Sequence, residues 1–139
     1  MINFFNDKNN NNEKFLCKVA SLLIHAAKID ETYTDDEKEI TKKTLIKLGA
    51  KNSNIDKIML DATLSEENSN QILDFTKEIK NAPEIIKIKI IEALWEIIYS
   101  NKNADMYETN LMRRLTGLIY IDYKVMGDIK EKIKKKFSK

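Results

Sequence analysis

The stretch PEIIKIKIIEALWEIIY, residues 83–99, decides the fold class of this chain. Its first half alternates Ile with Lys and imitates a strand, because successive strand side chains point to opposite faces. The segment then continues through Ala, Leu, Trp and Glu without a turn signal, and this length favours a helix. Pro83 suits a first helical position, and apolar residues fall on nearly all sides of the helix. We therefore expect the most buried helix of a bundle here.

Helical periodicity also describes the sequence on both sides of this segment. A broad apolar face runs from Leu16 to Ala27, and a polar break follows at residues 30–34. Further helices are predicted over residues 35–48, 55–63, 69–80, 106–120 and 123–136. The helix over 35–48 stops at Gly49, a residue that accepts a left-handed conformation at a helix end. The sequence predicts an all-α, single-domain bundle of about seven helices with no sheet.

The length of 139 residues suits one domain, because a chain of this size buries roughly 68% of its unfolded surface around one core. Hydrophobic residues make up 42% and charged residues 33%, a globular mixture. Residues 9–12 are all Asn, and such a tract buries no apolar surface to offset its ordering entropy. We predict a flexible lead-in over residues 1–12 and the helical domain over residues 13–139.

The net charge and the cysteine content argue against several classes of function. A net charge of +2 creates no global field that would gather nucleic acid, and no base-reading motif accompanies the basic residues. A single Cys excludes an intramolecular disulfide and a cysteine-rich zinc site. With one His and no Gly-rich phosphate loop, the chain is predicted to be no enzyme. No apolar run approaches the roughly 18 residues of a membrane span, so we expect a cytoplasmic protein.

Two short segments repeat each other at a distance of 71 residues (101 − 30). Residues 30–37 read DETYTDDE and residues 101–108 read NKNADMYE. Both have oxygen-bearing side chains at the first, third and fifth positions and Glu at the eighth. These residues are Asp30, Thr32, Thr34 and Glu37 in the first segment and Asn101, Asn103, Asp105 and Glu108 in the second. Each segment is expected to form a helix-loop-helix corner, so the bundle contains two pseudo-repeated corners.

Two interpretations of the corners remain open. Oxygen ligands converging from a loop and the next helical turn are what Ca²⁺ or Mg²⁺ prefers, and Glu offsets the positive helix N-terminus. In this interpretation the first corner is the stronger site, because Asp30 and Glu37 are both acidic whereas Asn101 is neutral. Alternatively, Thr34 with Glu37 forms only a capping box. Neither corner is an EF-hand, because the sixth position lacks Gly and the twelfth lacks Glu.

Over residues 15–132 the chain resembles the TerB-like family, the tellurite-resistance TerB proteins and their relatives. The resemblance is carried by AKID at residues 27–30 ahead of the first corner and by LWEIIYSN at residues 94–101 ahead of the second. It implies an all-α bundle with metal sites at the acidic corners. It also implies a stress-response role through metal sensing or protein contacts rather than through catalysis.

The C-terminal segment supports an alternative function. Ile129, Ile133 and Phe137 recur every four residues among lysines, which predicts a basic amphipathic helix. Such a helix can lie on an anionic membrane surface, meet an acidic protein partner, or dock as the last helix of the bundle. The alternative to a cation-binding module is therefore a helical protein-interaction module without metal. A protein partner is expected in either case, and the oligomeric state is open.

Overall fold

The computed structural model describes residues 9–28, 33–69, 72–100 and 104–137, and every regular element in these ranges is a helix. The elements are α1 (Asn9–Ala27), α2 (Asp35–Lys47), α3 (Ile55–Glu67), α4 (Leu73–Thr76), the 3₁₀ helix η2 (Ile79–Asn81), α5 (Glu84–Ser100), α6 (Ala104–Leu118) and α7 (Tyr123–Phe137). The predicted all-α bundle is confirmed.

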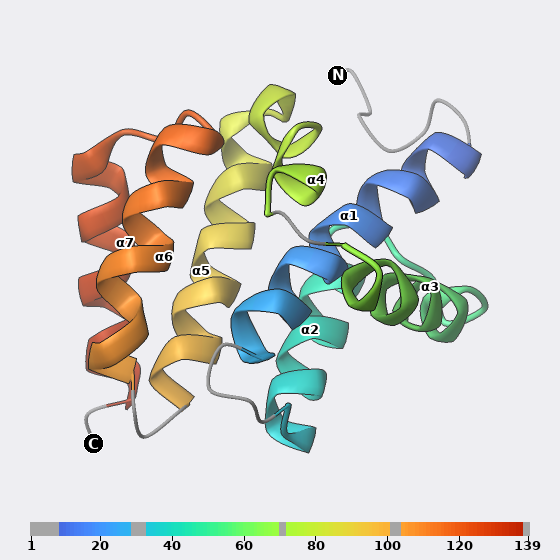
Figure 1. Cartoon of the computed structure of the whole chain (residues 1–139), viewed down its shortest axis with the longest axis horizontal. Coiled ribbons are helices and arrows are strands. Elements are labelled where there is room, and N and C mark those ends of the chain that lie inside the picture. Colours follow the sequence, from blue (N-terminus) through green and yellow to red (C-terminus); the bar gives the residue numbers. More distant parts are fainter. Residues whose placement is uncertain (1–8, 29–32, 70–71, 101–103, 138–139) are drawn as a thin grey trace.

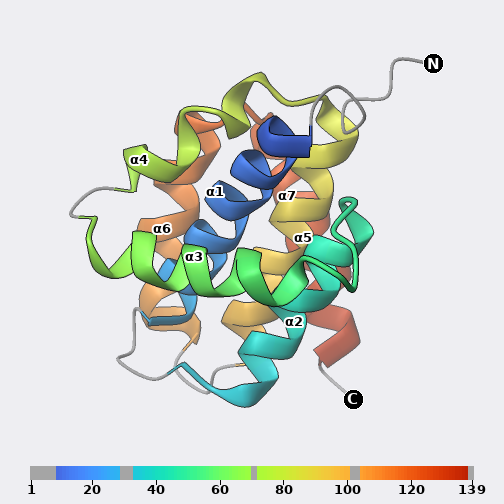
Figure 2. The ribbon, with the colours of Figure 1, turned by 90° about the vertical axis from the view of Figure 1, so that its right-hand side faces the viewer.

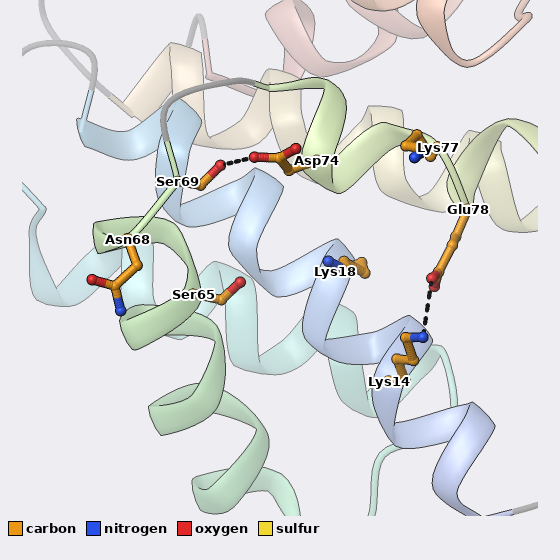
Figure 3. Close-up of a pocket in the computed structure, with 8 residues that line it drawn as sticks. All are labelled: Lys14, Lys18, Ser65, Asn68, Ser69, Asp74, Lys77 and Glu78. Carbon is orange, nitrogen blue, oxygen red and sulfur yellow. Dashed lines mark hydrogen bonds and ion pairs between the residues drawn. The ribbon is translucent and has the colours of Figure 1, made fainter.

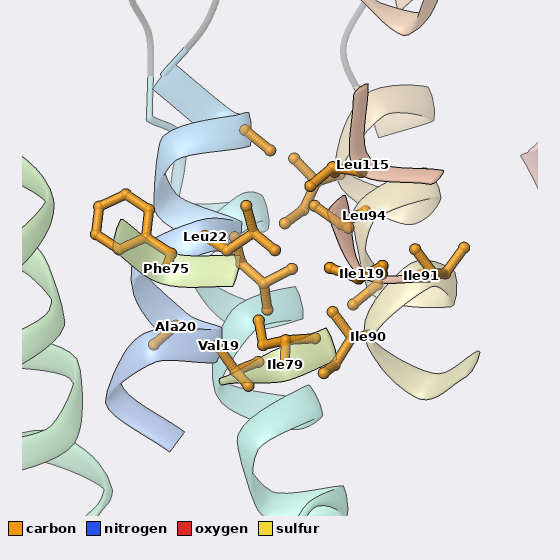
Figure 4. Close-up of a cluster of buried hydrophobic side chains, with 14 of the residues drawn as sticks. Val19, Ala20, Leu22, Phe75, Ile79, Ile90, Ile91, Leu94, Leu115 and Ile119 are labelled. Atoms are coloured by element: carbon orange, nitrogen blue, oxygen red, sulfur yellow. The ribbon is translucent and has the colours of Figure 1, made fainter. Parts of the chain in front are cut away.

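Two helices, α1 and α5, form the centre of the bundle. Helix α1 packs against α2, α3, α4 and α5, while α5 packs against α1, α2, α6 and α7. Ile90, Ile91 and Leu94 of α5 are fully buried, as expected for the helix with apolar residues on nearly all sides. Figure 4 shows Ile90 and Leu94 on the side of α5 that faces α1, with Ile79 of η2 beside Ile90 and Leu115 of α6 beside Leu94.

The 71-residue repeat extends from the corners to whole helices. A shift of 71 carries α2 onto residues 106–118 and α3 onto 126–138, close to the observed α6 and α7. The packing repeats as well, because α1 lies against α3 and α5 lies against α7. Figures 1 and 2 show these two three-helix units side by side, with α4 at one end of their junction. The bundle is thus two copies of one unit joined by α4 and η2.

A matching turn closes the second helix of each unit. Gly49 has a φ of 118° and Tyr120, which lies 71 positions later, has a φ of 56°. An L-residue other than glycine pays a steric cost in this left-handed region. Lys87, only 8% exposed, donates its Nζ to the carbonyl oxygen of Tyr120 at 3.4 Å, and Lys80 Nζ lies 5.7 Å from the centroid of the Tyr120 ring. The contacts of Lys87 and Lys80 offset part of the steric cost of the left-handed conformation at Tyr120.

The prediction of one continuous helix over residues 69–80 is wrong. The described part of this segment forms α4 and, separately, η2. Ala82 is extended, with a ψ of 156°, because the ring of Pro83 disfavours the helical conformation in the residue before it. Phe75 and Ile79 are nevertheless buried, so packing on α1 rather than helical hydrogen bonding positions the segment.

The largest differences from the predicted helix bounds lie in α3 and α1. Helix α3 continues to Glu67, past the predicted end at residue 63. Helix α1 begins at Asn9, inside the Asn tract that was predicted to belong to the flexible lead-in. Residues 1–8 lie outside the described part. In both helices the added residues continue an already formed helix, where each further residue gains a hydrogen bond without a new nucleation cost.

Candidate functional site

The corner between α1 and α2 begins with a reciprocal pair of hydrogen bonds. The backbone N–H of Glu37 donates to Thr34 Oγ1 at 3.1 Å, and the backbone N–H of Thr34 donates to Glu37 Oε1 at 2.7 Å. The predicted capping box is therefore confirmed. Asp30 and Thr32, the other two predicted ligands of this corner, lie outside the described residues.

The carboxylate of Glu37 is deeply buried, which capping alone does not require. The residue is 2% exposed, although the neighbouring Asp35 and Asp36 of the same turn are exposed. Burial of a carboxylate is costly, and the N–H of Thr34 together with the positive end of α2 offsets part of that cost. The carboxylate of Glu37 is therefore held in one position, seven residues after Asp30 in the sequence.

Tyr33 lies beside this carboxylate. Burial, and then the negative charge of Glu37, raise the pKa of Tyr33 to about 12. On its outer side, Lys38 Nζ lies 5.3 Å from the centroid of the Tyr33 ring. The first corner thus combines a fixed carboxylate with a partly buried phenol.

We expect an ultraviolet titration of the native protein to contain a late phase near pKa 12 from the ionisation of Tyr33. Tyr33→Phe should remove that late phase, whereas Tyr123→Phe should leave it in place. In the unfolded chain Tyr33 ionises near its ordinary pKa of 10.0 while the folded residue remains neutral. The free energy of unfolding should therefore fall as the pH rises above 10 and level off above 12. An unchanged late phase in Tyr33→Phe contradicts this assignment.

The second corner, between α5 and α6, is less completely described. Asn101 and Asn103 lie outside the described residues, as do the side chains of Asp105 and Glu108 in the first turns of α6. Of the eight predicted ligands, the structure therefore brings together Thr34 and Glu37. Among the residues described, no three His, Cys, Asp or Glu side chains converge on one point.

A polar groove that no sequence motif indicated lies between α1, α3 and the segment around α4. It has a volume of about 470 Å³ and is lined by Lys14, Lys18, Ser65, Asn68, Ser69, Asp74, Lys77 and Glu78 (Figure 3). Lys14 Nζ pairs with Glu78 Oε1 at 3.8 Å, and the hydroxyl of Ser69 donates to a carboxylate oxygen of Asp74. The lining residues come from three separate segments, so helical periodicity could not group them. Their charges largely compensate one another within the groove.

The thiol of Cys17 lines a cavity of about 330 Å³ that shares Lys14, Lys18 and Ser65 with this groove. Burial, and secondarily the charge of Asp61, raise the pKa of the Cys17 thiol above its ordinary value. Because the thiolate is the nucleophilic form, this environment makes Cys17 a poor nucleophile.

A family comparison covers both three-helix units. The family model described as tellurite resistance protein TerB matches residues 17–131, which include both corners. The chain belongs to the TerB family. Searches of curated proteins and of solved structures find no match.

In this TerB-family chain, two of the three stripe residues of the C-terminal helix lie inside the bundle, whereas Phe137 is exposed. Ile129 and Ile133 of α7 are buried, and α7 packs on α5. Lys132 Nζ contacts Glu92 Oε2 at 2.5 Å, and Lys136 Nζ contacts Glu96 Oε2 at 2.9 Å. A membrane or partner contact through α7 would therefore use its outer lysines rather than the Ile stripe. None of the helices in the described ranges is long and apolar enough to cross a bilayer.

Ion pairs join the first and third helices of both three-helix units. In the first unit, Glu13 Oε1 of α1 lies 3.5 Å from Lys57 Nζ of α3. Lys28 Nζ, directly after α1, contacts Glu66 Oε1 of α3 at 2.9 Å, and His25 Nδ1 lies 3.3 Å from Glu66 Oε2. In the second, the acidic residues lie on α5 and the basic ones on α7. His25 thus lies at the edge of the core and links α1 to α3.

Proposed function

We propose that this TerB-family chain is a non-catalytic stress module of the tellurite-resistance type that binds Ca²⁺ or Mg²⁺ at the corner between α1 and α2. The observation that supports the proposal is the position of the Glu37 carboxylate. It is buried, it accepts a hydrogen bond from the N–H of Thr34, and it follows Asp30 by seven residues and Thr32 by five in the sequence. A ligand that is already held in place costs less entropy when a cation binds.

The donor set fits a hard divalent cation. Asp30 and Glu37 supply two carboxylates, which balance a double positive charge, and Thr32 and Thr34 supply neutral oxygens. The hydroxyl of Thr34 accepts one hydrogen bond from the N–H of Glu37, and a hydroxyl oxygen has a second lone pair. The second corner is the weaker site, because Asn101 contributes no charge where the first corner has Asp30.

The test is an amide-resolved NMR titration of chelator-treated protein with calcium and then magnesium. We expect large shifts at residues 30–37, smaller shifts at 101–108 and none elsewhere. Asp30→Ala should abolish the shifts at residues 30–37. Thr34→Ala is the control for capping, because it should lower the free energy of unfolding by about 1 kcal/mol whether or not a cation binds. Absence of shifts at millimolar cation would refute the cation site.

The alternative is a helical interaction module whose corners serve only as caps. The observation in its favour is the set of large side chains left on the surface, among them Ile85, Tyr120 and Tyr123. Under this alternative Asp30→Ala costs little, because Thr34 is the cap. A cation titration without shifts, together with the normal cost of Thr34→Ala, would favour it.

A further inference from the structure

We propose that the outer face of α3 binds the same face of a second copy of this chain, with the two helices antiparallel. Ile55, Ile58 and Ala62 of α3 are buried, and the helix packs against α1 and α2. Figure 2 looks onto the outer side of α3, which no other described helix covers. This surface includes neither corner, so the inference goes beyond the cation site and does not depend on it.

Four exposed residues define the α3 face: Lys57, Leu60, Leu64 and Glu67. Their spacing of three, four and three residues places them along one side of the helix, as in the seam of a coiled coil. Leu60 is 60% exposed and Leu64 is 49% exposed. Two such leucines in consecutive turns can remove apolar area from water by packing against a similar helix.

The second three-helix unit provides an internal comparison. The shift of 71 residues carries Leu60 onto Glu131 and Leu64 onto Lys135 in α7. Both of these charged residues are exposed, and α7 packs against α5 as α3 packs against α1. The unit therefore folds with charged side chains at the two positions. The leucines of α3 are not required for packing within the unit, which indicates a contact outside it.

The charged residues of the α3 face identify a second copy as the partner. Lys57 lies three residues before Leu60. Glu67 lies three residues after Leu64, so the face is self-complementary about its midpoint. A two-fold axis through that midpoint makes the helices antiparallel, and each Leu60 then meets the second copy's Leu64. Each Lys57 likewise meets the second copy's Glu67. A parallel pair would oppose like charges at both positions, which is unfavourable.

Both charged groups are accessible for this pairing. Lys57 Nζ lies 3.5 Å from Glu13 Oε1, and Glu67 Oε2 lies 4.0 Å from Lys28 Nζ. The side chains of Lys57 and Glu67 nevertheless remain 69% and 54% exposed. Their order within α3 is unfavourable, because a lysine in the first turn and a glutamate at the last position oppose the helix macrodipole. Ion pairs with a second copy would offset this disadvantage.

The other charges of α3 argue against an anionic membrane as the partner. Asp56, Asp61 and Glu67 are exposed, and Lys57 is the only lysine of the helix. Helices that lie on anionic membranes are instead rich in lysine and arginine on their polar face. Asp61 is next to the midpoint of the α3 face, so it would approach its own copy. We therefore expect a weak and reversible dimer.

Sedimentation equilibrium of the whole chain, in the presence of chelator, tests the association. We expect a monomer–dimer equilibrium that Leu60→Glu weakens roughly tenfold or more, because it places a charge among the leucines. Ile85→Glu is the matched control, since Ile85 is 64% exposed and lies in α5, outside the α3 face. It should change the dissociation constant less than about twofold. Circular dichroism should show that both variants are folded, because both positions are largely exposed.

Charge reversal tests the antiparallel register. Lys57→Glu opposes glutamate with glutamate, and Glu67→Lys opposes lysine with lysine. Each variant alone should therefore self-associate roughly tenfold more weakly or worse. A mixture of the two variants should regain the dimer, because each copy then meets the opposite charge. A change within one chain cannot produce this recovery, and both substitutions suit the macrodipole of α3.

Several outcomes would overturn the proposal. One is a chain that is still monomeric at a concentration of about 1 mM. Others are a dimer that Leu60→Glu leaves unchanged, equal weakening by Ile85→Glu, and a mixture of the two charge variants that stays monomeric. A monomer that instead binds anionic vesicles through Leu60 would assign the leucines to a membrane. Failure of the cation titration at the first corner leaves this result unaffected, because the sedimentation sample contains no free divalent cation.

Discussion

Phe75→Ala is expected to lower the free energy of unfolding by about 3–5 kcal/mol. Phe75 is 1% exposed and lies in α4, which has only four residues and packs against α1. Its ring centroid is 6.2 Å from that of His25 on α1 (ring position in Figure 4). Because so short a helix has few hydrogen bonds of its own, burial of Phe75, together with that of Ile72 and Ile79, holds the segment that joins the two three-helix units. Urea unfolding followed by circular dichroism measures the change.

The matched control is Leu73→Ala in the same helix. Leu73 is 44% exposed, so we expect a loss well below 1 kcal/mol, on the order of a few tenths, since little buried surface and no cavity are involved. Equal losses in the two variants would show that the segment is held by its helical propensity and not by burial of Phe75.

Gly49→Ala is expected to lower the free energy of unfolding by about 1–2 kcal/mol. The φ of 118° at Gly49 lies where a Cβ is strongly disfavoured. The N–H of Gly49 donates to the carbonyl of Ile46, and the N–H of Ala50 to that of Leu45, so a changed φ would also disturb the last hydrogen bonds of α2. Thermal and urea unfolding should agree on the loss.

Tyr120→Gly is the reciprocal control at the equivalent turn of the second unit. The substitution relieves the left-handed strain at φ 56° and retains the backbone carbonyl that accepts from Lys87. It removes the contact with Lys80, a loss smaller than the strain relieved. We expect the free energy of unfolding to stay constant or to rise by up to about 1 kcal/mol. A decrease as large as that of Gly49→Ala would contradict the strain assigned to this turn.

Features that depend on neighbours in the sequence could be predicted. The capping box is one, because Thr34 and Glu37 are three residues apart and bond within a single helical turn. The stop of α2 at Gly49 and the helical state of residues 83–99 are others, since both follow from local conformational preference and a long run without turn signals. The corner repeat was also visible in the sequence, but its extension to entire three-helix units emerged from the helix order.

Features that depend on distant residues could not be predicted. The sequence shows Glu37 as a capping carboxylate but not that it is buried, because burial depends on how α1, α2 and α5 pack together. A pocket between α5, α6 and α7 combines Trp95, Arg113 and Lys130 from three helices, and no spacing within one helix relates them. Residues 69–80 have the right apolar spacing, yet their described part forms α4 and η2 separately, and Pro83 prevents η2 from continuing past Ala82.

The amino-acid sequence by itself determined that this chain is an all-α bundle of the TerB type with two similar corners, because helices, caps and stops arise from contacts within about four residues. Only the tertiary structure decided which polar groups are buried, which lysines find carboxylates, and where a cavity remains. Those outcomes depend on contacts between side chains of helices that are far apart in the sequence. A pattern of neighbouring residues does not determine such contacts.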